Sequence, residues 1–131
     1  MTESNTVFEF NKVTKVYEEG KALTKALDSV SFEVYRSDSF GIIGEESAGK
    51  STLVRHFTRL EEPTFGHISH EDKNIAELDD NALRSLRRRC VCVIAPFGLI
   101  ETRTVAENMH LAAELFHISP GDAGGRIDEL L

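Results

Sequence analysis

Residues 44 to 51 read Gly-Glu-Glu-Ser-Ala-Gly-Lys-Ser, which fits the pattern G-x-x-x-x-G-K-[ST] of a phosphate-binding loop. In such a loop the glycines let the backbone approach an anion, while successive N–H groups and the N-terminus of the following helix direct partial positive charge at it. The pattern therefore predicts that Lys50 reaches the β- and γ-phosphates of a nucleotide and that the Ser51 hydroxyl ligates Mg²⁺.

The segments on either side of this loop have the patterns that the motif requires. Residues 39–43 are largely apolar, which predicts a buried strand, and residues 52–60 place Leu53, Phe57 and Leu60 on one face of a helix. A chance match in an ordinary strand–turn–helix is the competing interpretation. The agreement between the motif and its flanks makes it the weaker one.

The loop also contains two carboxylates, Glu45 and Glu46, where a polyanion is expected to bind. Two unit charges about 4 Å apart repel by roughly 1 kcal/mol in water and by roughly 4 kcal/mol at an effective dielectric constant near 20. If both side chains face solvent, the backbone cradle survives at small cost. If they face the bound phosphates, nucleotide binding is weakened, and the sequence alone leaves both orientations open.

Length and charge narrow the classes of protein that remain. The 131 residues are one domain or part of one, and 40% hydrophobic residues are enough to fill a core. A net charge of -7 lacks the basic footprint of a nucleic-acid-binding protein, so we expect no nucleic acid among the partners. No signal peptide is expected, and the longest largely apolar run, residues 90–100, is too short to span a bilayer.

Alternation of apolar and polar residues predicts two strands ahead of the loop. The first begins at Val7 and continues as an extended segment to Tyr17, and the second alternates over residues 30–35. Two early strands indicate a small antiparallel layer beside a parallel α/β core. In that core the continuous apolar run at residues 90–94 is expected to form a strand that is covered on both faces.

Helices are expected in the second half of the chain. Asp79 or Asp80 is a candidate N-cap for a short helix over residues 81–86, whose end carries an arginine cluster that we interpret as a solvated face. Thr104 and Glu107 fit a capping box at the start of another helix. The apolar face of that helix is predicted to consist of Val105, Met109, Ala112 and Phe116.

With the loop placed, the chain resembles the N-terminal half of an ABC transporter ATPase subunit. The stretches that carry the resemblance are residues 12–17, 26–34, 44–52, 60–68 and 102–108. The likeness to methionine importers in particular rests on Arg87-Arg88, just before the apolar run, and on residues 102–108. The resemblance covers roughly residues 7–131.

The resemblance implies a P-loop NTPase core, with a partial parallel sheet and an N-terminal antiparallel β layer, over residues 7–95. Residues 96–131 would be a loop and the start of a helical subdomain, so that residues 1–131 form the N-terminal part of one nucleotide-binding domain. It also implies ATP and Mg²⁺ as ligands. The nucleotide-binding residues would be Tyr17, Gly44, Glu45, Glu46, Ser47, Ala48, Gly49, Lys50, Ser51 and Thr52, with Ser51 as the metal ligand.

Two of these assignments carry further consequences. Tyr17 falls where the family has the aromatic ring that stacks on adenine, although an ordinary strand-end aromatic is the alternative interpretation. The implied partners are a transmembrane permease subunit and, in the full-length form, a second nucleotide-binding subunit in a homodimer. The implied location is cytoplasmic, at the inner face of the cell membrane through the permease.

The sequence also departs from the family pattern. The family's Ser-Gly is Glu46-Ser47 here, its glycine early in the apolar strand is Val91, and its Mg²⁺-contacting glutamine is Ala95. The signature motif, the catalytic glutamate and the switch histidine lie beyond Leu131 in the family. Because phosphoryl transfer needs several such groups in place, we assign no catalytic residue and expect no useful ATP hydrolysis by this chain alone.

Two functions stay open at this point. The first is the ATP-binding subunit, in its N-terminal part, of an importer for methionine or another amino acid, which couples ATP binding and hydrolysis to transport. The second is a truncated or degenerate module that binds nucleotide without hydrolysis or only docks on a partner. A GTPase or kinase is a weaker third possibility, because residues 11–14 lack the aspartate of a guanine-reading N-K-x-D motif.

Overall fold

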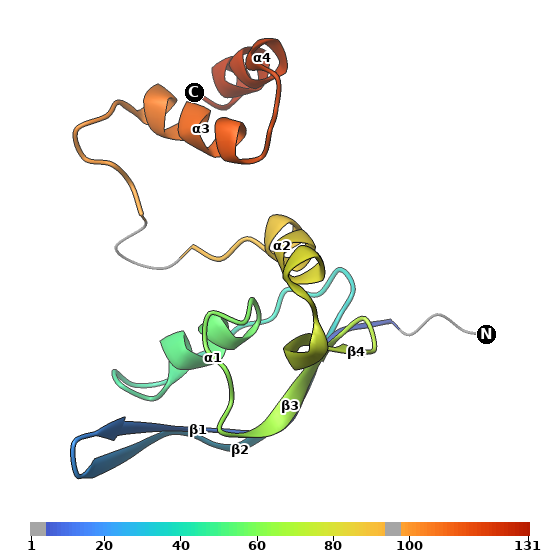
Figure 1. Ribbon diagram of the computed structural model, residues 1–131, viewed down its shortest axis with the longest axis vertical. Coiled ribbons are helices and arrows are strands. Elements are labelled where there is room, and N and C mark those ends of the chain that lie inside the picture. The colour runs from blue at the N-terminus through green and yellow to red at the C-terminus, as the bar shows by residue number, and fades with distance from the viewer. Residues whose placement is uncertain (1–4, 94–97) are drawn as a thin grey trace. The chain divides into compact units, whose positions relative to one another are not determined.

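The computed structural model describes residues 5–93 and 98–131, which form two compact units, Met1–Cys92 and Val93–Leu131. Figure 1 shows the order of the elements along the chain. The first unit contains β1 (Thr6–Glu19), β2 (Ala22–Tyr35), α1 (Lys50–His56), β3 (Phe65–His70), β4 (Lys73–Asn74), the 3₁₀ turn η1 (Ile75–Glu77) and α2 (Asp80–Arg89). The second unit contains α3 (Val105–Leu115) and α4 (Pro120–Leu130).

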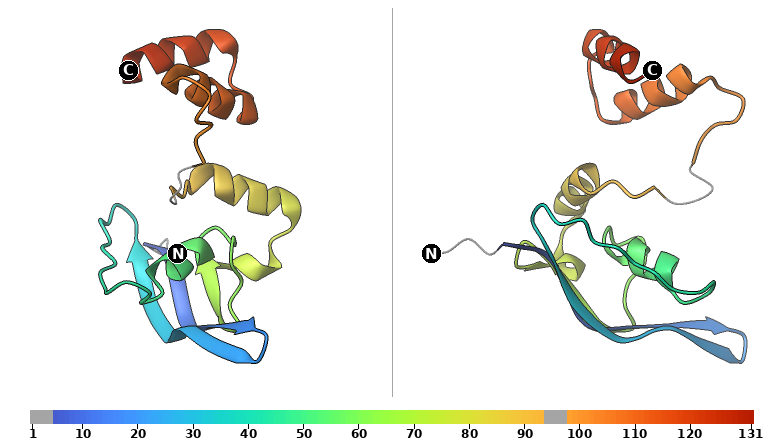
Figure 2. Two further views of the ribbon diagram at one scale, coloured as in Figure 1. Left: turned by 90° about the vertical axis from the view of Figure 1, so that its left-hand side faces the viewer. Right: turned by 180° about the vertical axis from the view of Figure 1, so that it is seen from behind.

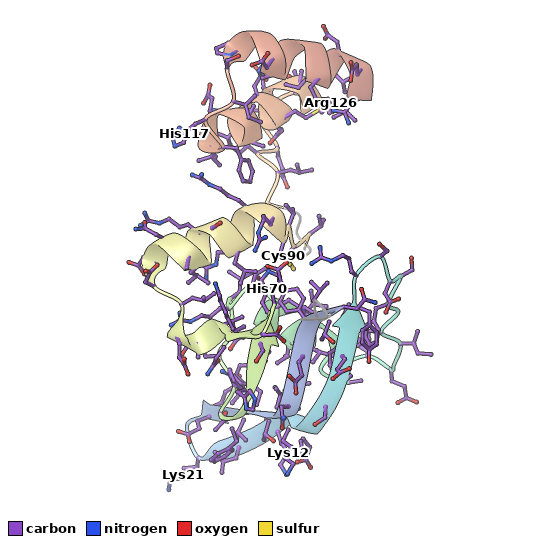
Figure 3. The ribbon with its side chains drawn as sticks, turned by 90° about the vertical axis from the view of Figure 1, so that its right-hand side faces the viewer. Lys12, Lys21, His70, Cys90, His117 and Arg126 are labelled. Carbon is purple, nitrogen blue, oxygen red and sulfur yellow. The ribbon has the colours of Figure 1, made fainter. Side chains whose placement is uncertain are left out.

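The strands of the first unit form one antiparallel sheet in the order β2-β1-β3-β4. This confirms the predicted antiparallel layer, and β1 and β2 both extend further than the alternation indicated. The two strands form a long hairpin that bends along its length, with Lys21 at its tip (Figures 2 and 3).

The pairing register of this hairpin shifts at four places, and two of these shifts are β-bulges that contain a residue with a positive φ. Lys12 in β1 and Ser29 in β2 both have a positive φ, and the pairing register shifts at each of them. The backbone N–H of Lys12 donates to Ser31 Oγ at 2.8 Å, and that of Ser29 donates to Thr14 Oγ1 at 2.9 Å, so neither bulge leaves its amide unsatisfied. A bulge adds one residue to a strand and reverses which side chains face the core. Phe10 and Val13 therefore share the buried face.

The core of the first unit lies between one face of the sheet and the helices α1 and α2. Its buried members are Phe8, Phe10, Val13, Leu27, Leu53, Ile68, Ile75 and Leu86. Phe57, just after α1, packs its ring against Phe8 and Phe10 with centroids 4.9 and 4.7 Å away. Arg87 of α2 donates to the carbonyl oxygens of Thr58 and Arg59, both at 2.9 Å, and so ties α2 to the end of α1.

The two parallel strands expected from the sequence do not form within the described residues. Residues 39–43 and the described part of the second segment, residues 90–93, have no strand ladder, and Ile43 is 96% exposed. A parallel strand needs strand neighbours and cover on both faces, and the described residues supply neither to these segments. The helix expected over residues 52–60 is α1, which begins two residues earlier and ends at His56, so Leu60 lies outside it and is exposed.

The second unit is a pair of packed helices. Thr104 and Glu107 form the predicted capping box at the start of α3, and Asp79 caps α2 in the first unit as expected. The predicted apolar face of α3 is only partly right. Ala106, Met109 and Ala113 pack against Ala123 and Ile127 of α4, whereas Val105, Ala112 and Phe116 are exposed. The reason is that α4 packs on a face of α3 that is rotated by one residue from the predicted face, so that Ala106 and Ala113 are covered in place of Val105 and Ala112.

Candidate functional site

A pocket of about 250 Å³ lies between the β1–β2 hairpin and the start of α1. The residues that line it are Tyr17, Thr24, Ala26, Ser47, Ala48, Gly49, Lys50, Ser51 and Thr52. Seven of the ten residues predicted for the site therefore surround one space, including Tyr17, which lies far from the loop in sequence. Gly44, Glu45 and Glu46 do not line this pocket.

Gly49 is required by the geometry at the base of the loop. It is the N-cap of α1 with φ of 85°, and a Cβ at this position would lie 2.2 Å from the carbonyl oxygen of Ala26 in β2. Only glycine adopts this left-handed conformation freely and lets the loop approach the neighbouring strand so closely. Ser47, where the family has glycine, also has a positive φ, of 64°, and a serine there is strained.

The ammonium group of Lys50 is bound inside the loop. Its Nζ donates to the carbonyl oxygen of Gly44 at 2.8 Å and also to that of Glu45. The N–H of Ala48 donates to the Glu45 carbonyl oxygen at 3.3 Å, which closes the turn. The loop is thus held around a cation that faces the same pocket as the first residues of α1.

The orientation of the two loop carboxylates was open from the sequence. In the structure Glu45 and Glu46 are both exposed, and neither belongs to the pocket lining. Their charges are therefore screened by solvent. The repulsion between these carboxylates and a bound anion is then closer to the value of roughly 1 kcal/mol in water than to the value of roughly 4 kcal/mol at a lower dielectric constant.

Sequence reasoning missed a polar cluster beside the pocket. Lys15 Nζ pairs with Glu61 Oε2 at 2.8 Å, donates to the Glu62 carbonyl oxygen at 2.9 Å and lies 5.0 Å from the centroid of the Tyr17 ring. The Tyr17 and Thr52 hydroxyl groups lie 3.4 Å apart. The hydrogen bond from Lys15 is the largest cause that holds the pKa of Glu61 below its ordinary value. Lys15 and Tyr17 are two residues apart in β1, so their side chains lie on the same face of the strand. This spacing was the signal in the sequence from which their contact could have been predicted.

His56 is a second residue that the sequence did not single out. It is completely buried near the end of α1, and its Nδ1 lies 2.6 Å from the carbonyl oxygen of Thr52. Because a carbonyl can only accept, Nδ1 carries the proton, and Nε2 has no hydrogen-bond partner among the described residues. Burial lowers the pKa of His56, so the imidazole is neutral near pH 7.

Other predicted features lie outside this pocket or outside the described residues. Ala95, which stands where the family has its glutamine, is not among the described residues. Within those residues, no group of three or more histidines, cysteines, aspartates or glutamates could hold a metal ion. None of the helices that the structure describes is long and apolar enough to cross a membrane.

Curated relatives are similar to most of this chain. The chain is 41% identical over 122 residues to the methionine import ATP-binding protein MetN 1 of Bacillus thuringiensis subsp. konkukian, which covers 93% of this chain. It is 35% identical over 125 residues to the methionine import ATP-binding protein MetN of Photobacterium profundum, which covers 95% of this chain. The chain spans about 36% of the length of each of these relatives.

Solved structures agree with this likeness. The chain matches a dimeric, post-hydrolysis state of the ATP-binding cassette MJ0796 bound to ADP and Pi, with a TM-score of 0.81 and 28% sequence identity. The match covers 93% of this chain and 54% of that cassette, and it identifies the fold as that of an ATP-binding cassette. The family described as ABC transporter matches residues 27–131. The chain therefore belongs to the ABC transporter family.

Proposed function

We propose that this chain is the N-terminal part of the ATP-binding subunit of an ABC-type importer for methionine or another amino acid. The observation that carries the proposal is the pocket in which Tyr17 and residues 47–52 face one space. The importer class is supported by the relatives, which are named methionine import ATP-binding proteins. In the whole protein, ATP binding and hydrolysis are coupled to transport.

Each part of the pocket has a role in holding Mg-ATP. Tyr17 stacks on the adenine ring, and residues 44–51, of which 47–51 line the pocket, wrap the phosphates with their backbone N–H groups. Lys50 exchanges the carbonyl oxygens of Gly44 and Glu45 for oxygens of the β- and γ-phosphates, which replaces neutral acceptors by charged ones. The Ser51 hydroxyl would ligate Mg²⁺, which would neutralise charge on the bound phosphates.

ATP hydrolysis also needs groups that lie outside this pocket. Phosphoryl transfer needs groups that position water and neutralise charge, and we assign none of them to the residues described. The partners are a transmembrane permease and a second nucleotide-binding subunit, for which the dimeric neighbour is a precedent. Residues 7–95 serve as the β layer and P-loop core, residues 96–131 begin the helical subdomain, and the subunit lies at the inner membrane face through its permease.

A titration with a fluorescent ATP analogue in the presence of Mg²⁺ tests the binding step. Wild type should bind, and Lys50→Ala should weaken binding about a hundredfold, because removing a charge-assisted phosphate contact costs up to ~3 kcal/mol. Lys21→Ala, which removes the same charge at the hairpin tip, is the control and should bind like wild type. Equal affinities for wild type and Lys50→Ala would overturn the proposal in favour of a docking module.

A further inference from the structure

The side chain of Lys15 is mostly buried and has two hydrogen-bond partners, unlike that of an exposed surface lysine. Its side chain is 16% exposed and that of Glu61 is 24% exposed, with 2.8 Å between Nζ and Oε2. A second hydrogen bond, to the Glu62 carbonyl oxygen at 2.9 Å, fixes the direction of the ammonium group. A partly buried pair with two bonds is screened less by solvent than an exposed ion pair.

The contacts of Lys15 also constrain the Tyr17 ring. The ammonium group lies 5.0 Å from the ring centroid, within the range of a cation–π interaction. The Tyr17 hydroxyl lies 3.4 Å from that of Thr52, and it also contributes to the lowered pKa of Glu61. The ring is therefore held at its face by Lys15 of β1 and at its hydroxyl by Thr52 of α1.

These contacts connect the Tyr17 side of the pocket to the side formed by the phosphate-binding loop. Glu61 follows α1, Thr52 lies in its first turn, and the same helix begins at the phosphate-binding loop. Without Lys15, the Tyr17 ring would lose its cation contact and keep the hydroxyl contact with Thr52. The distal half of the hairpin, which carries the ring, is largely exposed. A binding surface that is already ordered before the ligand arrives loses less conformational entropy on binding.

We propose that Lys15 is a positioning residue for base recognition, whose ion pair with Glu61 holds Tyr17 as a preformed platform for the base. The inference rests on the proposed function, because it assumes that the pocket binds a nucleotide. It adds a specific consequence: Lys15 sets how strongly the pocket prefers a nucleotide to a polyphosphate without a base.

The test compares the Kd of Mg-ATP with that of Mg-tripolyphosphate by calorimetry at constant ionic strength. Lys15→Met should weaken Mg-ATP binding about fivefold, since a cation–π contact of ~1 kcal/mol corresponds to that factor. Mg-tripolyphosphate binding should change by less than about twofold, because screening by salt limits the effect of a charge that does not touch the phosphates. Glu61→Gln should reproduce this selective loss.

Three further variants separate positioning from folding and from general charge. Lys21→Met removes the same charge at the hairpin tip and should leave both affinities unchanged. Lys15→Arg retains the pair with Glu61 and the cation at the ring, and should restore the preference for Mg-ATP. In a Tyr17→Leu background, Lys15→Met should cause no additional loss, because the platform it positions is gone.

The outcomes distinguish the inference from the function on which it rests. If Lys15→Met weakens both ligands equally, or neither, Lys15 does not act through base recognition and the inference is wrong. An additional loss in the Tyr17→Leu background would contradict it in the same way. A wild-type chain that binds neither ligand would overturn the proposed function, and the inference with it.

Discussion

His56 donates its Nδ1–H to the carbonyl oxygen of Thr52, 2.6 Å away, within the helix that follows the phosphate-binding loop. The imidazole fixes the backbone of a pocket residue from behind while its Nε2 stays buried without a partner among the described residues. Protonation of the ring would bury a positive charge, and burial therefore lowers the pKa of His56. The positive charge of Lys15 lowers the pKa of His56 further. The first turn of α1, which lines the pocket, is therefore stabilised by a buried histidine in its neutral form.

The first prediction concerns pH. Burial lowers the pKa of His56 from its ordinary value of 6.5, so the unfolded chain takes up a proton before the folded chain does. The free energy of unfolding should therefore be unaffected by His56 above about pH 6.5 and should fall as the pH drops from there toward the lower pKa of the folded state. Urea unfolding at half-unit steps of pH measures this.

Two variants make that measurement specific. His56→Leu should remove the decrease between about pH 6.5 and 5, while His110→Leu, which replaces an exposed histidine, should keep it. The carboxylates with lowered pKa, such as Glu61, lose their contribution only as the pH falls below their ordinary value of 4.5. A wild-type profile that stays flat down to pH 5 would contradict the role given to His56.

The second prediction concerns Ser47. Relief of the left-handed strain gains ~1–2 kcal/mol and the extra freedom of glycine in the unfolded chain costs ~0.5–1 kcal/mol, so Ser47→Gly should stabilise the chain by up to about 1.5 kcal/mol. Ala48→Gly, at a neighbouring residue without a positive φ, should destabilise it by about 0.5–1 kcal/mol. Urea unfolding of both variants checks the sign. Destabilisation by both would mean that residue 47 carries no strain.

The third prediction separates strain from steric clash at two glycines. Gly49 and Gly20 both have a positive φ, but a Cβ at Gly49 would meet the Ala26 carbonyl oxygen at 2.2 Å, whereas a Cβ at Gly20 would meet nothing within 4 Å. Gly20→Ala should cost up to about 1.5 kcal/mol, because the left-handed strain of ~1–2 kcal/mol is partly offset by the ~0.5–1 kcal/mol of unfolded-chain freedom that alanine removes, and Gly49→Ala should cost clearly more. Thermal unfolding followed by circular dichroism compares them, and equal losses would argue against the close approach of loop and strand.

The fourth prediction concerns the acidic loop. Because Glu45 and Glu46 are exposed beside the pocket, Glu45→Ala combined with Glu46→Ser should tighten Mg-ATP binding by roughly three- to tenfold at low salt, equivalent to ~1 kcal/mol of relieved repulsion. The gain should shrink at about 0.5 M salt, where charges are screened within a few ångströms. A gain that survives high salt would instead indicate a change in loop conformation.

The fifth prediction tests the capping box of α3. Thr104 Oγ1 accepts from the Glu107 N–H at 3.2 Å, and Glu107 Oε2 accepts from the Thr104 N–H at 2.7 Å. Thr104→Ala should weaken the helix by about 1 kcal/mol. It should also raise the pKa of Glu107, which is lowered first by its bond to the Thr104 backbone and then by the Thr104 hydroxyl. An NMR titration of Glu107 measures the shift, and Thr102→Ala should leave it unchanged.

Local chemistry made some features predictable from the sequence. The capping residues Asp79 and Thr104 act on atoms within three residues, so their roles were readable from spacing alone. The phosphate-binding loop was equally readable, because its pattern encodes a local backbone conformation. Tyr17 could be assigned to the same pocket only through the family resemblance, since nothing in its own neighbourhood indicates what lies across from it.

Features that depend on distant contacts were not predictable. The segment around Ile43 has the composition of a buried strand, yet pairing and burial require neighbours that the described residues do not provide. An apolar composition shows that a segment is able to form a strand, but whether it does so depends on hydrogen bonding to the other strands of the sheet. The Lys15–Glu61 pair was missed because it joins residues on two elements whose relative placement the alternation of β1 does not specify.

The bulge at Lys12 has a consequence for how this hairpin can vary. Ahead of it the buried positions of β1 fall on even numbers, at Phe8 and Phe10, and after it the inward side chains fall on odd ones, at Val13, Lys15 and Tyr17. Removing one residue there would leave the upstream aromatics in place and turn Tyr17 outward, away from the loop it faces. In that stretch natural variation should tolerate changes of identity far more readily than changes of length.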